Sequence, residues 1–331
     1  MVRTNLNMMI ISMFLVVFFV CQFNAGVAHA ANATRTTRVS SAAELSKALA
    51  NAQPGDRIVL AANTTFSGVF KGKVDGTATA HIILESEDPV NKSTLKGYGT
   101  GTGYALTILG DYWIVKNVKI QNAQKGLMLD NANHTLIDGV EVFNIGMEAI
   151  HFRDGSSHNI LQNSQIYNTG IVNPGYGEGV YVGSDKGKWN TYAPSADHNT
   201  IRNNVIGPNV RAEHIDIKEG TTGTIVSGNI FYGAGISGVN YADSFIDVKG
   251  NDVKVDGNTG YRDNNTNIKD AFQLHQQLPS WGINAEFNNN SVYLDEPTGY
   301  VVNAANGTTA KAYNNKRSPL GNMYMGNVTT D

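Results

Sequence analysis

The stretch from residue 212 to residue 220 places three titratable side chains on one predicted β-strand. His214, Asp216 and Lys218 alternate there with Ile215 and Ile217. Because successive strand residues point to opposite faces, the isoleucines would face a core and the titratable groups would face outward. Folding requires only the apolar face, so the outward groups are candidates for chemistry.

A second strand, residues 245–249, repeats the arrangement with Asp247 and Lys249. Neighbouring strands lie about 4.8 Å apart. Asp216 would then lie beside Asp247, and Lys218 beside Lys249. Like charges placed directly opposite each other are destabilising, which favours a functional face over an ordinary solvated one.

Clustered cations favour an anionic polymer, and clustered carboxylates suit Ca²⁺. On a long open face the two together fit a uronic-acid polysaccharide and β-elimination. In that reaction a base removes the proton beside the uronate carboxylate while a cation neutralises the carboxylate. We predict Lys218 as the base, because a lysine beside another cation has a lowered pKa.

The other residues of this face have predicted roles in the same reaction. Lys249 or Arg153 would neutralise the carboxylate or act as the acid partner. Tyr181 or His214 would position the sugar or protonate the leaving oxygen. The predicted substrate-binding residues are Tyr181, His151, Gln273 and His275. The predicted Ca²⁺ ligands are Glu213, Asp216, Asp247 and, from the preceding strand, Glu178.

A repeated turn motif indicates how such strands are stacked. An apolar residue, any residue, and then Gly or Asn recurs, with the third residue at positions 117, 139, 163, 203, 228, 257 and 289. A period of about 20 to 30 residues is typical of one coil of a solenoid. Asn and Gly suit a turn with positive φ, and stacked Asn side chains can form amide ladders. The interval from 163 to 203 is longer, which predicts loops that leave the coil and shape a site.

The chain from Ser41 to Leu60 is predicted to close one end of the stack. Ser41 and Glu44 form a capping box ahead of Leu45 and Leu49, which share one helix face. A turn and the alternating strand 57–60 follow. We therefore predict an all-β, right-handed parallel β-helix with a short N-terminal capping helix, and residues 31–331 as a single domain.

The first 30 residues have the pattern of a secretory signal peptide. An apolar run from about Met8 to Cys21 ends in a small-x-small motif at Ala28–Ala30. Residues 31–331 then lack cysteine, which excludes a disulfide scaffold and a thiol enzyme. With Arg3 removed, the net charge goes from -3 to -4, and no basic run suggests nucleic acid. We expect a secreted monomer with no membrane partner once the leader is removed.

Eight Asn-x-Ser/Thr sequons are glycan acceptors if the source is eukaryotic and carry no meaning if it is bacterial. They begin at Asn32, Asn63, Asn91, Asn133, Asn264, Asn289, Asn306 and Asn327.

These residues resemble the pectate-lyase-like superfamily of parallel β-helices. Within it, Glu213, Lys218 and Gly220 are similar to the motif of the chondroitinase-B/alginate-lyase family, where a calcium-binding Glu precedes the base Lys by five residues. The family has a second Glu where this chain has Arg211, and an Arg where it has Lys249. The resemblance implies a lyase acting on an acidic polysaccharide such as pectate or alginate. The alternatives are a non-catalytic carbohydrate-binding or adhesion β-helix, a uronan epimerase and a glycoside hydrolase.

Overall fold

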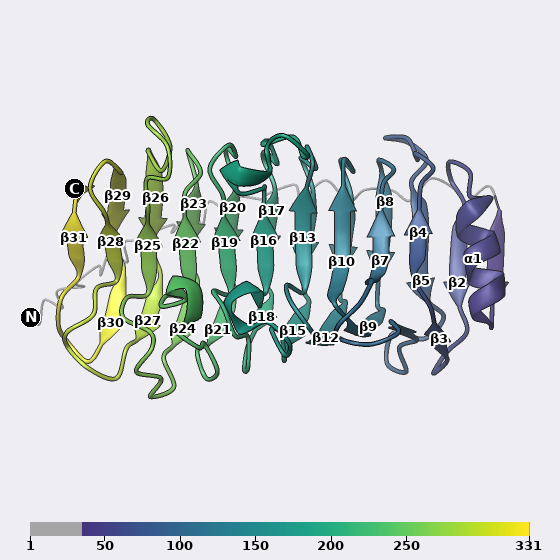
Figure 1. Ribbon diagram of the computed structural model, residues 1–331, viewed down its shortest axis with the longest axis horizontal. Helices are drawn as coiled ribbons and strands as arrows, with labels where there is room; N and C mark the ends of the chain where they lie inside the picture. The colour runs from purple at the N-terminus through teal and green to yellow at the C-terminus, as the bar shows by residue number, and fades with distance from the viewer. Residues whose placement is uncertain (1–34, 331) are drawn as a thin grey trace, which may run out of the picture.

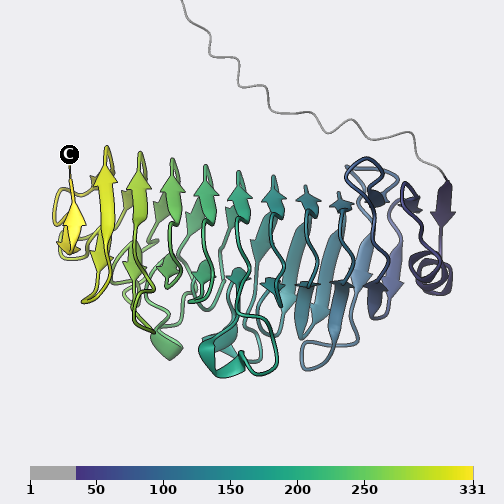
Figure 2. The ribbon, with the colours of Figure 1, turned by 90° about the horizontal axis from the view of Figure 1, so that it is seen from above.

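The computed structural model describes residues 35–330, which form three long parallel sheets. The predicted leader and the sequon at Asn32 lie outside the described residues. Each coil of the chain crosses sheet A, then sheet B, then sheet C, and the coils stack along the long axis of the molecule (Figures 1 and 2). The prediction of a right-handed parallel β-helix is confirmed.

The sheets have 12, 10 and 10 strands. Sheet A consists of β1 (Thr36–Val39), β2 (Arg57–Leu60), β5 (Ile82–Ser86), β8 (Trp113–Lys116), β11 (Leu136–Asp138), β14 (Ile160–Gln162), β17 (Thr200–Arg202), β20 (Ile225–Ser227), β23 (Lys254–Asp256), β26 (Ala285–Asn288), β29 (Ala310–Tyr313) and β32 (Val328–Thr329). Sheet B consists of β3 (Thr65–Ser67), β6 (Thr94–Lys96), β9 (Lys119–Ala123), β12 (Glu141–Ile145), β15 (Gln165–Tyr167), β18 (Val205–Ile206), β21 (Ile230–Tyr232), β24 (Thr259–Tyr261), β27 (Ser291–Tyr293) and β30 (Lys316–Ser318). Sheet C consists of β4 (Phe70–Gly72), β7 (Tyr104–Ile108), β10 (Lys125–Asp130), β13 (Ile150–Arg153), β16 (Val180–Val182), β19 (Ile215–Ile217), β22 (Ile246–Val248), β25 (Phe272–Leu274), β28 (Val302–Ala304) and β31 (Tyr324–Gly326).

The predicted turn motif forms the corner between sheets A and B. Asn117, Asn163 and Asn203 have φ of 55°, 53° and 56°, and Gly139 in the same place has φ of 63°. Asn and Gly adopt this left-handed region at low cost, which explains why these two types recur there.

A buried asparagine ladder follows this corner, one residue later than predicted. Asn229 accepts from the backbone and the side chain of Asn204, and its own amide donates to Asn258 Oδ1 at 2.9 Å. Asn258 bonds Asn290 in the same way. The turn residues themselves face outward, because a left-handed residue at a corner points away from the interior and the next residue points in.

The inward side chains of sheet C stack as predicted. Both apolar positions of β13, β16, β19, β22 and β25 are fully buried: Ile150, Phe152, Val180, Val182, Ile215, Ile217, Ile246, Val248, Phe272 and Leu274. They hold the strands that carry the polar outward face.

Helix α1 (Ala42–Ala50) closes the N-terminal end of the stack (Figure 1). Ser41 accepts a hydrogen bond from the Glu44 N–H, and Leu45 and Leu49 are buried, as the sequence predicts. In residues 35–330 no helix has the length and apolarity needed to cross a membrane.

Three short 3₁₀ turns lie on excursions next to sheet C: η1 (Pro174–Tyr176), η2 (Lys186–Lys188) and η3 (Val239–Tyr241). The first two belong to the long coil predicted from the turn spacing, which also contains β16. In Figure 1, η2 lies beyond the upper ends of the sheet C strands, and η1 and η3 lie beyond their lower ends.

Replacement of Asn229 by Ala is expected to destabilise the fold by about 2 kcal/mol, because buried backbone and amide groups lose their partners. Denaturant unfolding followed by circular dichroism measures the change. Asn306→Ala, at an exposed turn, is the control and should change the free energy of unfolding by less than about 0.5 kcal/mol. Equal effects of the two variants would contradict a stabilising ladder.

Candidate active site

The outward face of sheet C arranges the predicted residues in two rows that cross the strands. One row, one residue per coil, is His151, Tyr181, Asp216, Asp247 and Gln273. The other row, two residues further along each coil, is Arg153, Gly183, Lys218, Lys249 and His275. The parallel register therefore pairs Asp216 with Asp247, as the sequence predicts.

Lysine ammonium groups separate the carboxylates of this face. Lys249 Nζ lies 2.7 Å from Asp216 Oδ1 and 2.6 Å from Asp247 Oδ2. Lys218 Nζ lies 2.8 Å from the other oxygen of Asp216. The four groups form one network of alternating charge, so the repulsion expected from the register is replaced by attraction.

The network keeps both lysines charged. Burial is the largest single effect on Lys218 and opposes its charge, but the charge and hydrogen bond of Asp216, with the charges of Asp247 and Glu178, together outweigh burial and raise the pKa of Lys218. Burial is likewise outweighed at Lys249, where Asp216 and Asp247 raise the pKa. The prediction of a lowered pKa for Lys218 is wrong, because the carboxylates act more strongly than the neighbouring ammonium. Lys218 must therefore lose a proton before it can act as a base.

Three buried carboxylates converge beside these lysines. Glu178, Glu213 and Asp216 each place one oxygen within 4.8 Å of the others. Burial, followed by repulsion from Glu148 and Asp216, raises the pKa of Glu178 to about 8. Burial and Asp216 also raise the pKa of Glu213 well above its usual range. Protons therefore remain on part of this cluster at neutral pH unless another cation replaces them.

Asp247 lies beside this cluster but outside it. Its two oxygens bind Lys249 and His275 Nδ1, the latter at 2.8 Å. Gln273, its neighbour across the strands, donates to Asp270 at 3.1 Å. Of the four predicted calcium ligands, the structure brings together Glu178, Glu213 and Asp216.

His214 points away from this face, contrary to the prediction. Its ring is fully buried, 5.4 Å from Phe231 and 5.6 Å from Phe245, and its Nε2 bonds the Tyr232 carbonyl at 3.0 Å. β19 begins only at Ile215, so His214 lies in the bend before the strand, where alternation does not apply. Burial lowers the pKa of His214 to about 4. Glu213, one residue earlier, is left facing the site.

Tyr181 lies between Asp216 and His151. Lys218 Nζ is 5.0 Å from the centre of its ring. Burial, followed by the charge of Asp216, raises the pKa of Tyr181 well above its usual range, so the phenol keeps its proton. His151 bonds Glu148 and the Gly183 carbonyl with its two ring nitrogens.

Arg153 is two strands away from Lys218 and is already paired. It forms a bidentate pair with Asp130 at 2.7 and 2.8 Å, and its guanidinium lies 4.1 Å from the ring centre of Tyr192. Sequence reasoning missed both partners. Asp130 could have been found, because residues 125–130 align with the later strands, whereas Tyr192 lies in an irregular loop with no register.

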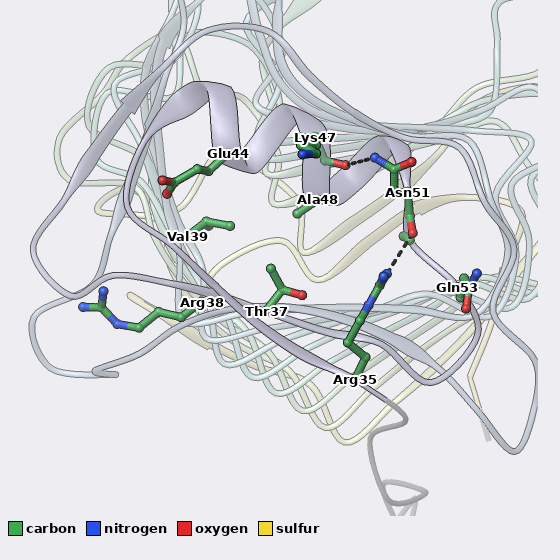
Figure 3. Close-up of a pocket in the computed structure, with 10 residues that line it drawn as sticks. Arg35, Thr37, Arg38, Val39, Glu44, Lys47, Ala48, Asn51 and Gln53 are labelled. Atoms are coloured by element: carbon green, nitrogen blue, oxygen red, sulfur yellow. Dashed lines mark hydrogen bonds between the residues drawn. The ribbon is translucent and has the colours of Figure 1, made fainter.

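A pocket of about 640 Å³ lies elsewhere, between β1 and α1 at the N-terminal end. Arg35 and Lys47 line it, and Arg35 donates to the Asn51 carbonyl across it (Figure 3). It contains none of the predicted site residues, and sheet C is the face with converging ionisable groups.

Comparison with known proteins places the chain among polysaccharide lyases. It is 56% identical to the alginate lyase from Paenibacillus sp. str. FPU-7, over 90% of this chain and 100% of that one, with a TM-score of 0.89. Pectate lyase Pel9A (14% identity, 90% and 78% coverage, TM-score 0.62) and a PL6 family polysaccharide lyase from Pseudopedobacter saltans (15%, 85% and 63%, 0.54) are similar in fold. No family model and no curated protein matches the chain. The predicted resemblance to pectate-lyase-like β-helices is confirmed.

Replacing Asp247 by Asn is expected to lower the pKa of His275. The hydrogen bond to Asp247 is the main reason that the pKa of His275 is raised. A raised pKa stabilises the folded state, and this contribution is complete below about pH 6.5, the ordinary pKa of histidine. It is lost as the pH rises through the pKa of His275 in the folded protein. NMR titration of the imidazole measures the shift. Asp256→Asn, on sheet A, should leave the titration unchanged, and an unchanged titration in D247N would contradict the pairing.

Proposed function

We propose that this chain, which belongs to the family of the Paenibacillus alginate lyase and is a polysaccharide lyase, cleaves alginate at the outward face of sheet C. The observation that carries the proposal is the group of Lys218, Lys249 and Tyr181 around Asp216 in a chain 56% identical to that enzyme. The substrate is an acidic polysaccharide, and the row of cations along sheet C suits its carboxylates.

Lys218 is the proposed base. Its deprotonated amine takes the proton beside the uronate carboxylate, a carbon–carbon double bond forms, and the bond to the leaving oxygen breaks. Asp216 is shared with Lys249, so it remains paired when Lys218 turns toward the sugar. The raised pKa of Lys218 makes the active form scarcer at neutral pH, and turnover should therefore rise with pH.

Tyr181 is the proposed proton donor to the leaving oxygen. Its phenol lies beside Lys218, is partly exposed, and holds its proton at neutral pH because its pKa is raised. Lys249 and His275 continue the cationic row and suit the carboxylates of neighbouring sugars. Arg153, held by Asp130, suits a binding role further along sheet C and replaces neither Lys218 nor Tyr181.

Ca²⁺ is the proposed cofactor, held by Glu178, Glu213 and Asp216. Oxygen donors of this kind suit Ca²⁺, and the raised pKa values of the two glutamates mark uncompensated negative charge that a cation would relieve. Bound there, Ca²⁺ would neutralise the uronate carboxylate and compete with Lys218 for Asp216. Both Asp216 oxygens already face lysines, so we place the greater share of the binding on Glu178 and Glu213.

We also propose that the chain is exported through its N-terminal leader. An exported enzyme would act on the polymer outside the cell. The predicted signal peptide in residues 1–30 is consistent with that route.

The purified protein is expected to produce unsaturated uronate from alginate, with pectate and glycosaminoglycans as comparison polymers. Ultraviolet absorbance of the new double bond measures it. A chelator should reduce the rate and added Ca²⁺ should restore it. A rate unaffected by the chelator would exclude Ca²⁺ as the cofactor without excluding the lyase reaction. Inverted sugars without absorbance would indicate an epimerase, and binding without either product would indicate an adhesion module.

Lys218→Met is expected to lower kcat by about 10²–10⁴-fold, the usual contribution of a general base. Tyr181→Phe should lower kcat as well, with an unchanged circular dichroism spectrum in both variants. Lys254→Met, an exposed lysine on the face of sheet A, is the matched control. Retained turnover in K218M would exclude Lys218 as the base.

A further inference from the structure

The loop that follows β16, residues 184–198, reaches along the outward face of sheet C in both directions. Toward the N-terminal end, the ring of Tyr192 covers the guanidinium of Arg153 on β13. Toward the other end, Lys186 Nζ donates to the Gln277 carbonyl, in the loop that follows β25, at 2.8 Å. β13 and β25 are four strand steps apart in sheet C, which corresponds to about 19 Å at the usual strand spacing.

The base of this loop is fixed beside the proposed catalytic lysine. The Lys186 N–H donates to Glu219 Oε1 at 2.8 Å, and Glu219 is fully buried and directly follows Lys218. Trp189 donates from Nε1 to the Ser184 carbonyl. Its ring covers Gly220, where an added Cβ would come within 2.9 Å of it. The loop backbone is thus held by buried partners, while the Lys186 side chain is exposed and reaches Gln277.

The contact at the end of this side chain is weak and exchangeable. The Lys186 ammonium is exposed and bonds a neutral carbonyl, and within residues 35–330 it has no carboxylate partner. A hydrogen bond from an ammonium to a carboxylate is shorter and stronger than one to a neutral oxygen. A uronate carboxylate arriving at this end of the groove would therefore displace Gln277 as the acceptor.

We propose that Lys186 is a substrate-positioning residue that binds a uronate carboxylate beyond Lys249, so that the loop holds the polymer along the outward face of sheet C. The inference rests on the proposed function. Lys186 contacts Gln277, two residues after His275, and so lies at the His275 end of the row, and Arg153 with Tyr192 marks the opposite end. The two ends of the loop thereby define the length of polymer that it contacts, about 19 Å by the strand spacing. Lys186 takes no part in proton transfer.

The test compares Lys186→Met with Lys188→Met, a lysine of the same 3₁₀ turn and the same charge whose ammonium has no partner in residues 35–330. K186M is expected to raise KM for alginate about fivefold, as for the loss of one exposed ion pair, with kcat within twofold. K188M should match the wild type, and Lys186→Arg should largely restore KM.

The dissociation constant for alginate, measured by calorimetry in the K218M background, gives a second readout that does not require turnover. Weaker binding with K186M than with K188M supports the proposal even if the wild type cleaves no uronan, in which case only the proposed function fails. Equal affinities and equal KM values for the two variants would overturn the inference and leave the lyase assignment untouched. A lowered kcat at unchanged KM in K186M would overturn it as well, because a positioning role predicts a raised KM at nearly unchanged kcat.

Discussion

The register between coils is the constraint on which the rest of this molecule depends. Each coil repeats the path of its neighbour because left-handed corner residues and buried asparagines join them, as Asn204, Asn229 and Asn258 do. A fixed path places every residue one strand spacing from its equivalent in the next coil. Any polar residue placed at the same position in successive coils then becomes part of a row, and the outward face of sheet C is the result.

Rows of identical charge are unfavourable unless the adjacent row compensates them. Asp216 and Asp247 are neighbours by register, and Lys218 and Lys249 lie two residues further along the same strands. Lys249 bonds both aspartates, so the two rows neutralise each other across the strand direction. Burial strengthens these contacts and also makes any unpaired charge costly. The same network that stabilises the face thus holds the lysines in their charged form. Lys218 has to give up a proton, and with it part of this stabilisation, before it can act as the base.

The period of the corner motif was sufficient to predict the coils. The alternation of side chains along a strand was sufficient to predict that Ile215 and Ile217 are core residues and that Asp216 lies beside Asp247 on the outward face. Alternation fails at His214, because the bend before β19 rotates that residue into the interior and leaves Glu213 facing out. The protonation state of Lys218 could not be predicted from the sequence. The sequence identified the charged residues around Lys218, but only side-chain distances decide whether its ammonium lies closer to a carboxylate or to another lysine. Tyr192 had no register from which its position could be inferred.

The longest coil is also where the scaffold and the chemistry meet. A solenoid tolerates insertions at its corners because the strands of each coil pair only with those of neighbouring coils, and here the inserted loop 184–198 is tied back to the regular part through buried Glu219. That residue directly follows Lys218, so the backbone that positions the proposed base also carries the residue that anchors the loop. A change in the path of this coil would therefore move both the proposed base and the loop.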